Sequence, residues 1–134
     1  MKNEEPTDVG PVRLRRAYDE PGPDDGRRIL VDRVWPRGRT KDALRLDGWL
    51  RDLAPSTELR RWFGHDPARW PAFVERYRAE LADPAKGEQL DALAASARER
   101  PITLVFGARD EEHNQAQVIA AEIRARLGAP DDAG

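Results

Sequence analysis

The chain has 134 residues, a length that favours a single domain around one hydrophobic core. It contains no cysteine, which excludes disulfide bonds and thiolate metal sites and suits a reducing compartment. Its 23 basic and 25 acidic residues leave a formal net charge of -2, which gives the chain no overall attraction to a polyanion such as duplex nucleic acid.

Both ends of the sequence are polar and lack an apolar period. We expect flexible tails over residues 1–10 and 128–134, with one α/β domain over residues 11–127 between them. The N-terminus lacks the apolar stretch of a secretion signal, and no later run is long enough to span a bilayer. These features predict a cytoplasmic protein of bacterial type that does not interact with a membrane.

Two short strands are predicted in the first part of the domain. Val12, Leu14 and the Ala17-Tyr18 pair alternate imperfectly, as in a strand. The following residues 21–26 are dense in turn formers and indicate a loop. Residues 29–31, Ile-Leu-Val, form a continuous apolar run bounded by charge, which is typical of a strand covered on both faces.

Helices are predicted throughout residues 40–100. The first starts at Thr40 and ends at Pro55, and Ser56 caps a short second one. Asp66-Pro67 and Asp83-Pro84 each combine an N-cap with a first-turn proline. The apolar side chains at helical spacing that we expect to face the core are Leu46, Trp49, Leu50, Leu53, Leu59, Trp62, Phe63, Trp70, Phe73, Val74, Tyr77, Leu81, Leu90, Leu93, Ala94 and Ala97.

The last part of the domain predicts one strand and one helix. Residues 102–106, Ile-Thr-Leu-Val-Phe, are rich in β-formers and indicate another interior strand. The chain turns at residues 107–110, and Asp110 is expected to cap a final helix that ends at Leu127. The order strand, helices, strand, helix predicts a small α/β domain, with a parallel-type sheet and helices packed around it.

Two segments directly follow interior strands and carry arginines. Residues 32–39 follow the first of these strands, and residues 107–114 follow the last. Ligands in open parallel sheets bind beyond the carboxyl ends of the strands, where helix N-termini direct N–H groups into the same space. If the two strands are parallel neighbours, Arg33 and Arg109 lie near each other beside one pocket.

Arginine suits such a pocket because its planar fork donates paired hydrogen bonds to phosphate or carboxylate. We therefore expect a small anionic ligand and no cofactor. Arg37-Gly38 follows Pro36 in a turn whose backbone N–H groups can also face an anion. The candidate ligand-binding residues from position alone are Arg33, Trp35, Arg37, Gly38 and Arg109.

Structural alternatives stay open for these residues. Arg33 could instead pair with Asp110, or Arg109 with Asp32, so that the arginines fix the loops. Trp35 could pack beneath the helices rather than stack on a ligand.

Both histidines of the chain stand at predicted helix starts. The field at a helix N-terminus disfavours a protonated ring at His113, and a neutral imidazole can act as a general base. His65, Asp110 and His113 are therefore the candidate catalytic residues. Alternatively, His65 fixes a loop, and His113 bonds to Asp110 three residues earlier. The spacing of these residues predicts no metal site. Whether the protein is an enzyme stays open.

Several sequence blocks resemble the YeaO-like family, a group of small bacterial and archaeal proteins catalogued as domain of unknown function 488. The blocks comprise residues 31–38, residues 52–56, residues 59–63, residues 64–67 with Trp70, Phe73, Arg76, Tyr77, Glu80 and Leu81, and residues 103–104 and 108–110 with His113 and Asn114. Together they cover about residues 12–125. The resemblance implies a compact α/β fold and one shared site that adds Asp66, and Asn114 as a ligand-binding residue, to the candidates above.

Two other functions stay open. In nucleic-acid binding or processing, the arginines would contact phosphates and Trp35 a base, which needs a local basic surface and is disfavoured by the near-neutral total charge. In a non-enzymatic interaction module, the four tryptophans would form a contact surface, although three of them are in phase with helical cores. The sequence leaves substrate identity, reaction type, oligomeric state and metal dependence open.

Overall fold

The fold is built on a four-stranded sheet in which every strand pair is parallel. A computed structural model describes residues 10–133, with side chains described through Gly128. The N-terminal tail expected over residues 1–10 lies outside the described residues except for Gly10. In the spatial order β1-β4-β2-β3, the strands are β1 (Val12–Arg16), β4 (Ile102–Phe106), β2 (Arg27–Leu30) and β3 (Gly48–Trp49). The predicted parallel sheet is therefore confirmed.

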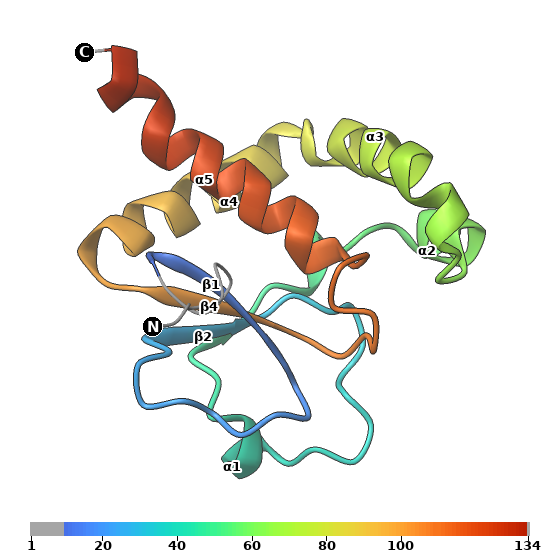
Figure 1. The fold of residues 1–134 in the computed structure, drawn as a ribbon, viewed down its shortest axis with the longest axis horizontal. Coiled ribbons are helices and arrows are strands. Elements are labelled where there is room, and N and C mark those ends of the chain that lie inside the picture. Colours follow the sequence, from blue (N-terminus) through green and yellow to red (C-terminus); the bar gives the residue numbers. More distant parts are fainter. Residues whose placement is uncertain (1–9, 134) are drawn as a thin grey trace, which may run out of the picture.

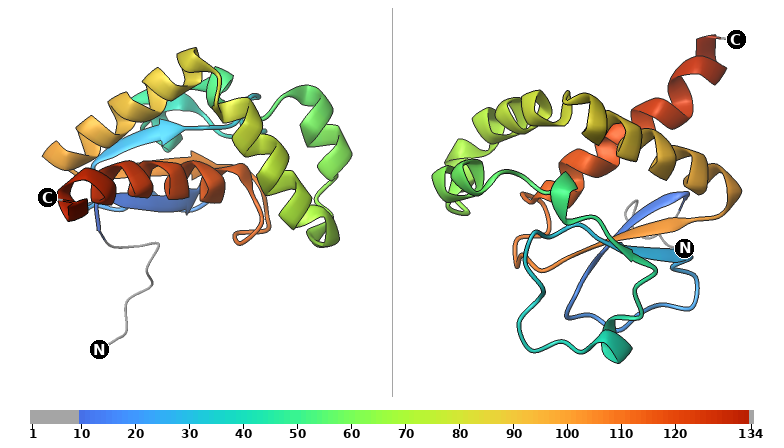
Figure 2. Two further views of the ribbon diagram at one scale, coloured as in Figure 1. Left: turned by 90° about the horizontal axis from the view of Figure 1, so that it is seen from above. Right: turned by 180° about the vertical axis from the view of Figure 1, so that it is seen from behind.

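Helices cover the two faces of this sheet unequally. On one side lie α3, α4 and α5, whereas the single-turn helix α1 lies on the other side (Figures 1 and 2). The helical elements are α1 (Lys41–Leu44), η2 (Arg51–Leu53), α2 (Thr57–Phe63), η3 (Pro67–Arg69), α3 (Trp70–Leu81), α4 (Pro84–Glu99) and α5 (Gln115–Ala133).

Each face of the sheet has its own hydrophobic core. Along β4, Leu104 and Phe106 point into a large core shared with α2 to α5, while Val105 points the other way. Val105 belongs to a small core whose fully buried members are Ala17, Leu30, Leu44 and Val105, with Trp35, Leu46 and Trp49 packed against it. Alternation along the strands thus sends neighbouring side chains into different cores.

The helix predicted from Thr40 to Pro55 is wrong in its length. Thr40 does cap α1, accepting a hydrogen bond from the Ala43 N–H at 3.0 Å, but α1 ends at Leu44 and Arg45 adopts a left-handed φ of 50°. The chain then forms β3 and η2. The reason is that Trp49 packs in the small core and Leu53 in the large core, so the segment must pass around the edge of the sheet.

The last helix also differs from its prediction. It begins at Gln115 rather than after Asp110, and the Oδ1 atom of Asn114 accepts the Gln117 N–H at 3.3 Å. At its other end α5 extends to Ala133, through most of the segment expected to be a tail over residues 128–134.

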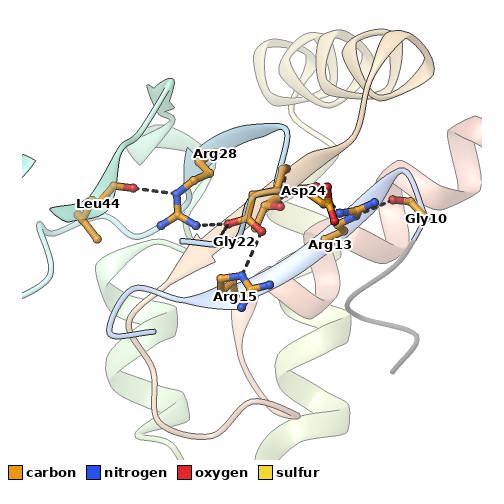
Figure 3. Close-up of polar contacts among 9 residues, drawn as sticks. Gly10, Arg13, Arg15, Gly22, Asp24, Arg28 and Leu44 are labelled. Atoms are coloured by element: carbon orange, nitrogen blue, oxygen red, sulfur yellow. Dashed lines mark hydrogen bonds and ion pairs between the residues drawn. The ribbon is translucent and has the colours of Figure 1, made fainter. Parts of the chain in front are cut away.

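A buried ion pair stabilises the small-core face (Figure 3). Arg28 of β2 and Asp25 are each 3% exposed, and their charged groups are 2.6 Å apart. The Nε atom of Arg28 donates to the Leu44 carbonyl, and Arg15 of β1 contacts the same Asp25 carboxylate at 3.2 Å. The pair therefore joins β1, β2 and α1, and these two arginines have a structural role.

Candidate functional site

A cavity of about 510 Å³ lies at the carboxyl ends of the strands. Residues that follow each of the four strands line it, and α2, α3 and the segment before α5 complete its wall. The lining residues are Tyr18, Asp32, Arg33, Val34, Trp35, Pro36, Arg37, Ala54, Pro55, Arg60, Phe63, His65, Phe73, Gly107, Ala108, His113, Asn114 and Gln115. This is the position at which parallel sheets bind ligands.

The sheet topology explains why a cavity forms between β2 and β4. These strands are neighbours, with Leu30 paired to Val105. After β2 the chain passes to α1 on the small-core face, whereas after β4 it passes to α5 on the opposite face. The two connections diverge and leave space between them, as at the switch point of other open α/β sheets.

Six of the nine candidate residues from the sequence line this cavity. They are Arg33, Trp35, Arg37, His65, His113 and Asn114. Gly38 and Arg109 are exposed and do not line it, and Asp110 lies behind His113. Asp66, which the family resemblance suggested, accepts the Ala68 N–H at the start of η3 and does not line the cavity.

Arg33 binds the protein's own backbone. Its Nε and Nη2 atoms donate to the carbonyl oxygens of Ala54 and Pro55 at 3.1–3.2 Å. These carbonyls precede α2, so Arg33 fixes the connection that carries α2 to the cavity. Neither the Arg33–Asp110 pair nor the Arg109–Asp32 pair that the sequence left open occurs among the ion pairs of the described residues.

The loop that follows β2 is held from several sides. The Trp35 Nε1 atom donates to the Arg39 carbonyl at 2.6 Å, and its ring meets Trp49 edge-on at 5.4 Å. Trp35 therefore packs in the small core and not under the larger helices. The hydroxyl of Tyr18 donates to the Arg37 carbonyl at 3.0 Å. These contacts fix the backbone from which the Arg37 side chain projects.

Arg37 and Arg60 differ from Arg33 because their guanidinium groups have no hydrogen-bond or ion-pair partner within residues 10–128. Both residues are exposed and lie on the rim of the cavity. Tyr18 and Val34, the two large hydrophobic side chains that are exposed in this part of the chain, lie on the same rim. The rim thus offers two uncommitted cations beside apolar surface.

Asp110 and His113 form a hydrogen-bonded pair, which confirms the structural alternative for His113. The Nδ1 atom of His113 is 2.9 Å from Oδ2 of Asp110, and Oδ1 accepts the backbone N–H groups of Glu112 and His113. The hydrogen bond from His113 is the main reason that the pKa of Asp110 lies below its usual value. Asp110 therefore caps the turn before α5, and Nε2 is the ring nitrogen of His113 that remains for a ligand.

His65 reaches the rim through an unusual backbone conformation. Gly64 ends α2 with φ 55°, and His65 continues in the left-handed region with φ 58°. Such a conformation is uncommon and unfavourable for a residue other than glycine. The ring of His65 lies 6.3 Å from Phe63, which also lines the cavity.

Asp32, Arg60 and Gln115 line the cavity but were not candidates from the sequence. The Oδ2 atom of Asp32 accepts the Gly107 N–H at 2.9 Å, and Oδ1 accepts the side-chain amide of Gln115. Burial raises the pKa of Asp32 from 3.8 to about 6, against the lowering effects of these hydrogen bonds and of Arg60. The position of Asp32 next to Arg33 was a usable signal, whereas Arg60 depends on how α2 packs.

The described residues form neither a metal cluster nor a membrane-spanning helix. Residues 10–133 contain no group of three or more histidine, aspartate or glutamate side chains arranged to hold a metal ion. In the same part of the chain, no helix is both long enough and apolar enough to cross a membrane.

The fold defines a small α/β protein, with a four-stranded parallel sheet and helices packed around it. Residues 11–134 match the family model described as the inactive DUF488-N3 subclade. The uncharacterized protein YeaO of Escherichia coli is 41% identical over 113 residues, covering 84% of this chain and 96% of YeaO. The uncharacterized protein Rv3073c of Mycobacterium tuberculosis is 41% identical over 115 residues, covering 86% of this chain and 95% of the relative.

The chain therefore belongs to the YeaO-like DUF488 family. No solved structure matches it. The family assignment agrees with the resemblance seen in the sequence blocks, and it brings no established activity, because the relatives are themselves uncharacterized.

Proposed function

We propose that this protein binds a small anionic molecule, a phosphate or a carboxylate, in the cavity at the strand ends. The observation that carries the proposal is the pair of rim arginines, Arg37 and Arg60, whose guanidinium groups have no partner in the described part of the chain. An ionised acceptor would satisfy both of them with short, charge-assisted hydrogen bonds.

The charge balance of the lining supports the same ligand class. Arg33, Arg37 and Arg60 line the cavity, and Asp32 is the single acidic residue among the lining residues. A cavity of about 510 Å³ falls within the range of small-molecule sites, so it suits a metabolite rather than a bare ion alone.

We propose binding without turnover as the main role. The family model describes an inactive subclade, and this description favours a binding pocket over an active site. The Asp110–His113 hydrogen bond supports a second possibility, proton transfer, because it leaves Nε2 of His113 available as a base. Mixing the protein with an identified ligand and following the ligand by NMR separates the two: the binding role predicts an unchanged ligand after prolonged incubation.

Calorimetry and thermal unfolding at low salt test the binding itself. We expect inorganic phosphate or a small carboxylate to raise the melting temperature, since a ligand present at 100 times its Kd stabilises the native state by about 2.7 kcal/mol. Arg37→Met and Arg60→Met should each weaken binding by roughly tenfold to a hundredfold, as a lost charged hydrogen bond costs about 1.5–3 kcal/mol.

Arg109→Met is the matched control, because Arg109 is exposed but does not line the cavity. Its affinity should equal that of the unaltered protein. The proposal fails if no anion stabilises the protein, or if Arg109→Met weakens binding as much as the rim variants do.

A further inference from the structure

Asp32 lines the strand-end cavity, and its carboxylate keeps acceptor positions that the fold does not use. Its carboxylate receives one hydrogen bond from the Gly107 N–H and one from the Gln115 side chain. An ionised carboxylate has about four acceptor positions. Roughly two positions therefore remain, on a side chain that lines the cavity.

The carboxylate also lacks an ion-pair partner among the described residues. Arg33, its neighbour in sequence, directs its guanidinium group to backbone carbonyls instead. The positive charge of Arg60 lowers the pKa of Asp32, but burial outweighs this effect and raises the pKa to about 6. The carboxylate is thus largely buried without a direct ion-pair partner in this part of the chain, which disfavours its charged form.

The fold does not need this charge. An asparagine at position 32 could accept the Gly107 N–H with Oδ1 and donate from Nδ2 to Oε1 of Gln115, whose amide can turn over. Both connections would survive without the cost of burying a carboxylate. A charge kept beside a cavity under these conditions is typical of a functional group.

We infer, on the basis of the binding function proposed above, that Asp32 selects the ligand: the cavity takes an anion that also carries an amino or other N–H donor group. The anionic part contacts Arg37 and Arg60 on the exposed rim, and the donor hydrogen-bonds to the Asp32 carboxylate deeper in the cavity. The two ends of the ligand thus meet opposite charges at different depths.

Matched pairs of phosphates test this inference by calorimetry at pH 7.5 and low salt. One pair is phosphoethanolamine and propyl phosphate, which differ by an ammonium in place of a methyl group. The other is adenosine monophosphate and purine riboside monophosphate, which differ by one ring amino group. We expect the amino member of one pair to bind at least tenfold more tightly, and the pair that shows this preference distinguishes an aliphatic from a heterocyclic ligand.

Variants assign the preference to Asp32. Asp32→Asn should reduce it to less than threefold, while Arg60→Met should weaken both members of the pair equally. Asp42→Asn is the control, because Asp42 is exposed on α1 and does not line the cavity, and it should keep the preference. Thermal unfolding of Asp32→Asn establishes that the variant is folded.

Proton exchange provides a second measurement at pH 6. A donor on the carboxylate favours its ionised form, so the amino ligand should release more protons on binding than its matched partner does. Titrations of the adenosine and purine riboside monophosphates, whose phosphate groups are alike, in buffers of different ionisation enthalpy measure this difference, and Asp32→Asn should abolish it. The other titratable and charged groups that line the cavity, among them His65, His113, Arg33, Arg37 and Arg60, are the same for both members of this pair.

The inference is overturned if the matched members bind equally to the unaltered protein, or if Asp32→Asn keeps the preference. In either case phosphate binding that depends on Arg37 and Arg60 would leave the proposed function intact. If no probe binds at all, the proposed function fails and this inference fails with it.

Discussion

Replacing Asp32 by asparagine should stabilise the protein at neutral pH. Burial raises the pKa of Asp32 from 3.8 to about 6, which corresponds to roughly 3 kcal/mol, since each pKa unit is worth about 1.4 kcal/mol. Because this carboxyl holds its proton more tightly in the folded than in the unfolded chain, the contribution of Asp32 to stability is greatest below pH 4 and is lost as the pH rises through about 6. Above that range the full cost of the buried charge is present.

The asparagine variant carries no such charge, so the difference in stability between the two proteins should change with pH. Urea unfolding followed by circular dichroism from pH 3.5 to 8 measures it. We expect the variant to gain up to about 3 kcal/mol relative to the unaltered protein between pH 4 and 7, with no further gain above. A difference that is independent of pH, or that favours aspartate more as the pH rises, would refute the assignment of a raised pKa to Asp32.

Three further changes probe the backbone and the buried ion pair. Gly26→Ala should cost more than about 2 kcal/mol in urea unfolding, because Gly26 has φ 68° and an added Cβ would lie 2.0 Å from the Pro101 carbonyl oxygen; an unchanged midpoint would contradict this close approach. Arg28→Met should lower the free energy of unfolding by about 3–5 kcal/mol, because it leaves the Asp25 carboxylate buried without its partner. Adding Asp25→Asn to this variant should recover part of the loss in the same assay. If the losses of the two single variants simply add in the double variant, the two side chains do not interact. His65→Gly should raise the free energy of unfolding by about 1 kcal/mol, because it removes a left-handed non-glycine residue. A loss of stability would show that the backbone at His65 is unstrained. Anion affinity, measured by calorimetry, falls in this variant if the His65 ring contributes to the site.

The fold was largely predictable from local patterns. The run from Ile102 to Phe106 marks β4, and Asp66-Pro67 and Asp83-Pro84 mark the starts of two helical regions. Such strand runs and helix starts can be read from the sequence because they are set by residues adjacent in the chain and by burial of the segment as a whole. The segment from Thr40 to Pro55 was not predictable in this way, because its apolar residues keep a helical spacing although they belong to two separate cores.

The position of the cavity was predictable, but the contacts of the residues around it were not. The loops after β2 and β4 both line the cavity, as expected for neighbouring parallel strands. The sequence could not show that Arg33 would bind the Ala54 and Pro55 carbonyls or that Arg109 would face solvent. It could not place Arg60 either, since that depends on how a short helix packs against the end of the sheet.

The small core has a consequence for the order in which parts of the molecule open. The loop that carries Arg37 is anchored through Trp35 to four fully buried side chains, whereas the opposite wall belongs to the extensive core beneath α3 to α5. Segments with little buried apolar surface exchange their amide hydrogens through local openings long before global unfolding. The loop that carries Arg37 should therefore open and close as a unit, while the wall formed by the large core stays closed. A ligand that contacts both walls would slow amide exchange in this loop far more than in the sheet.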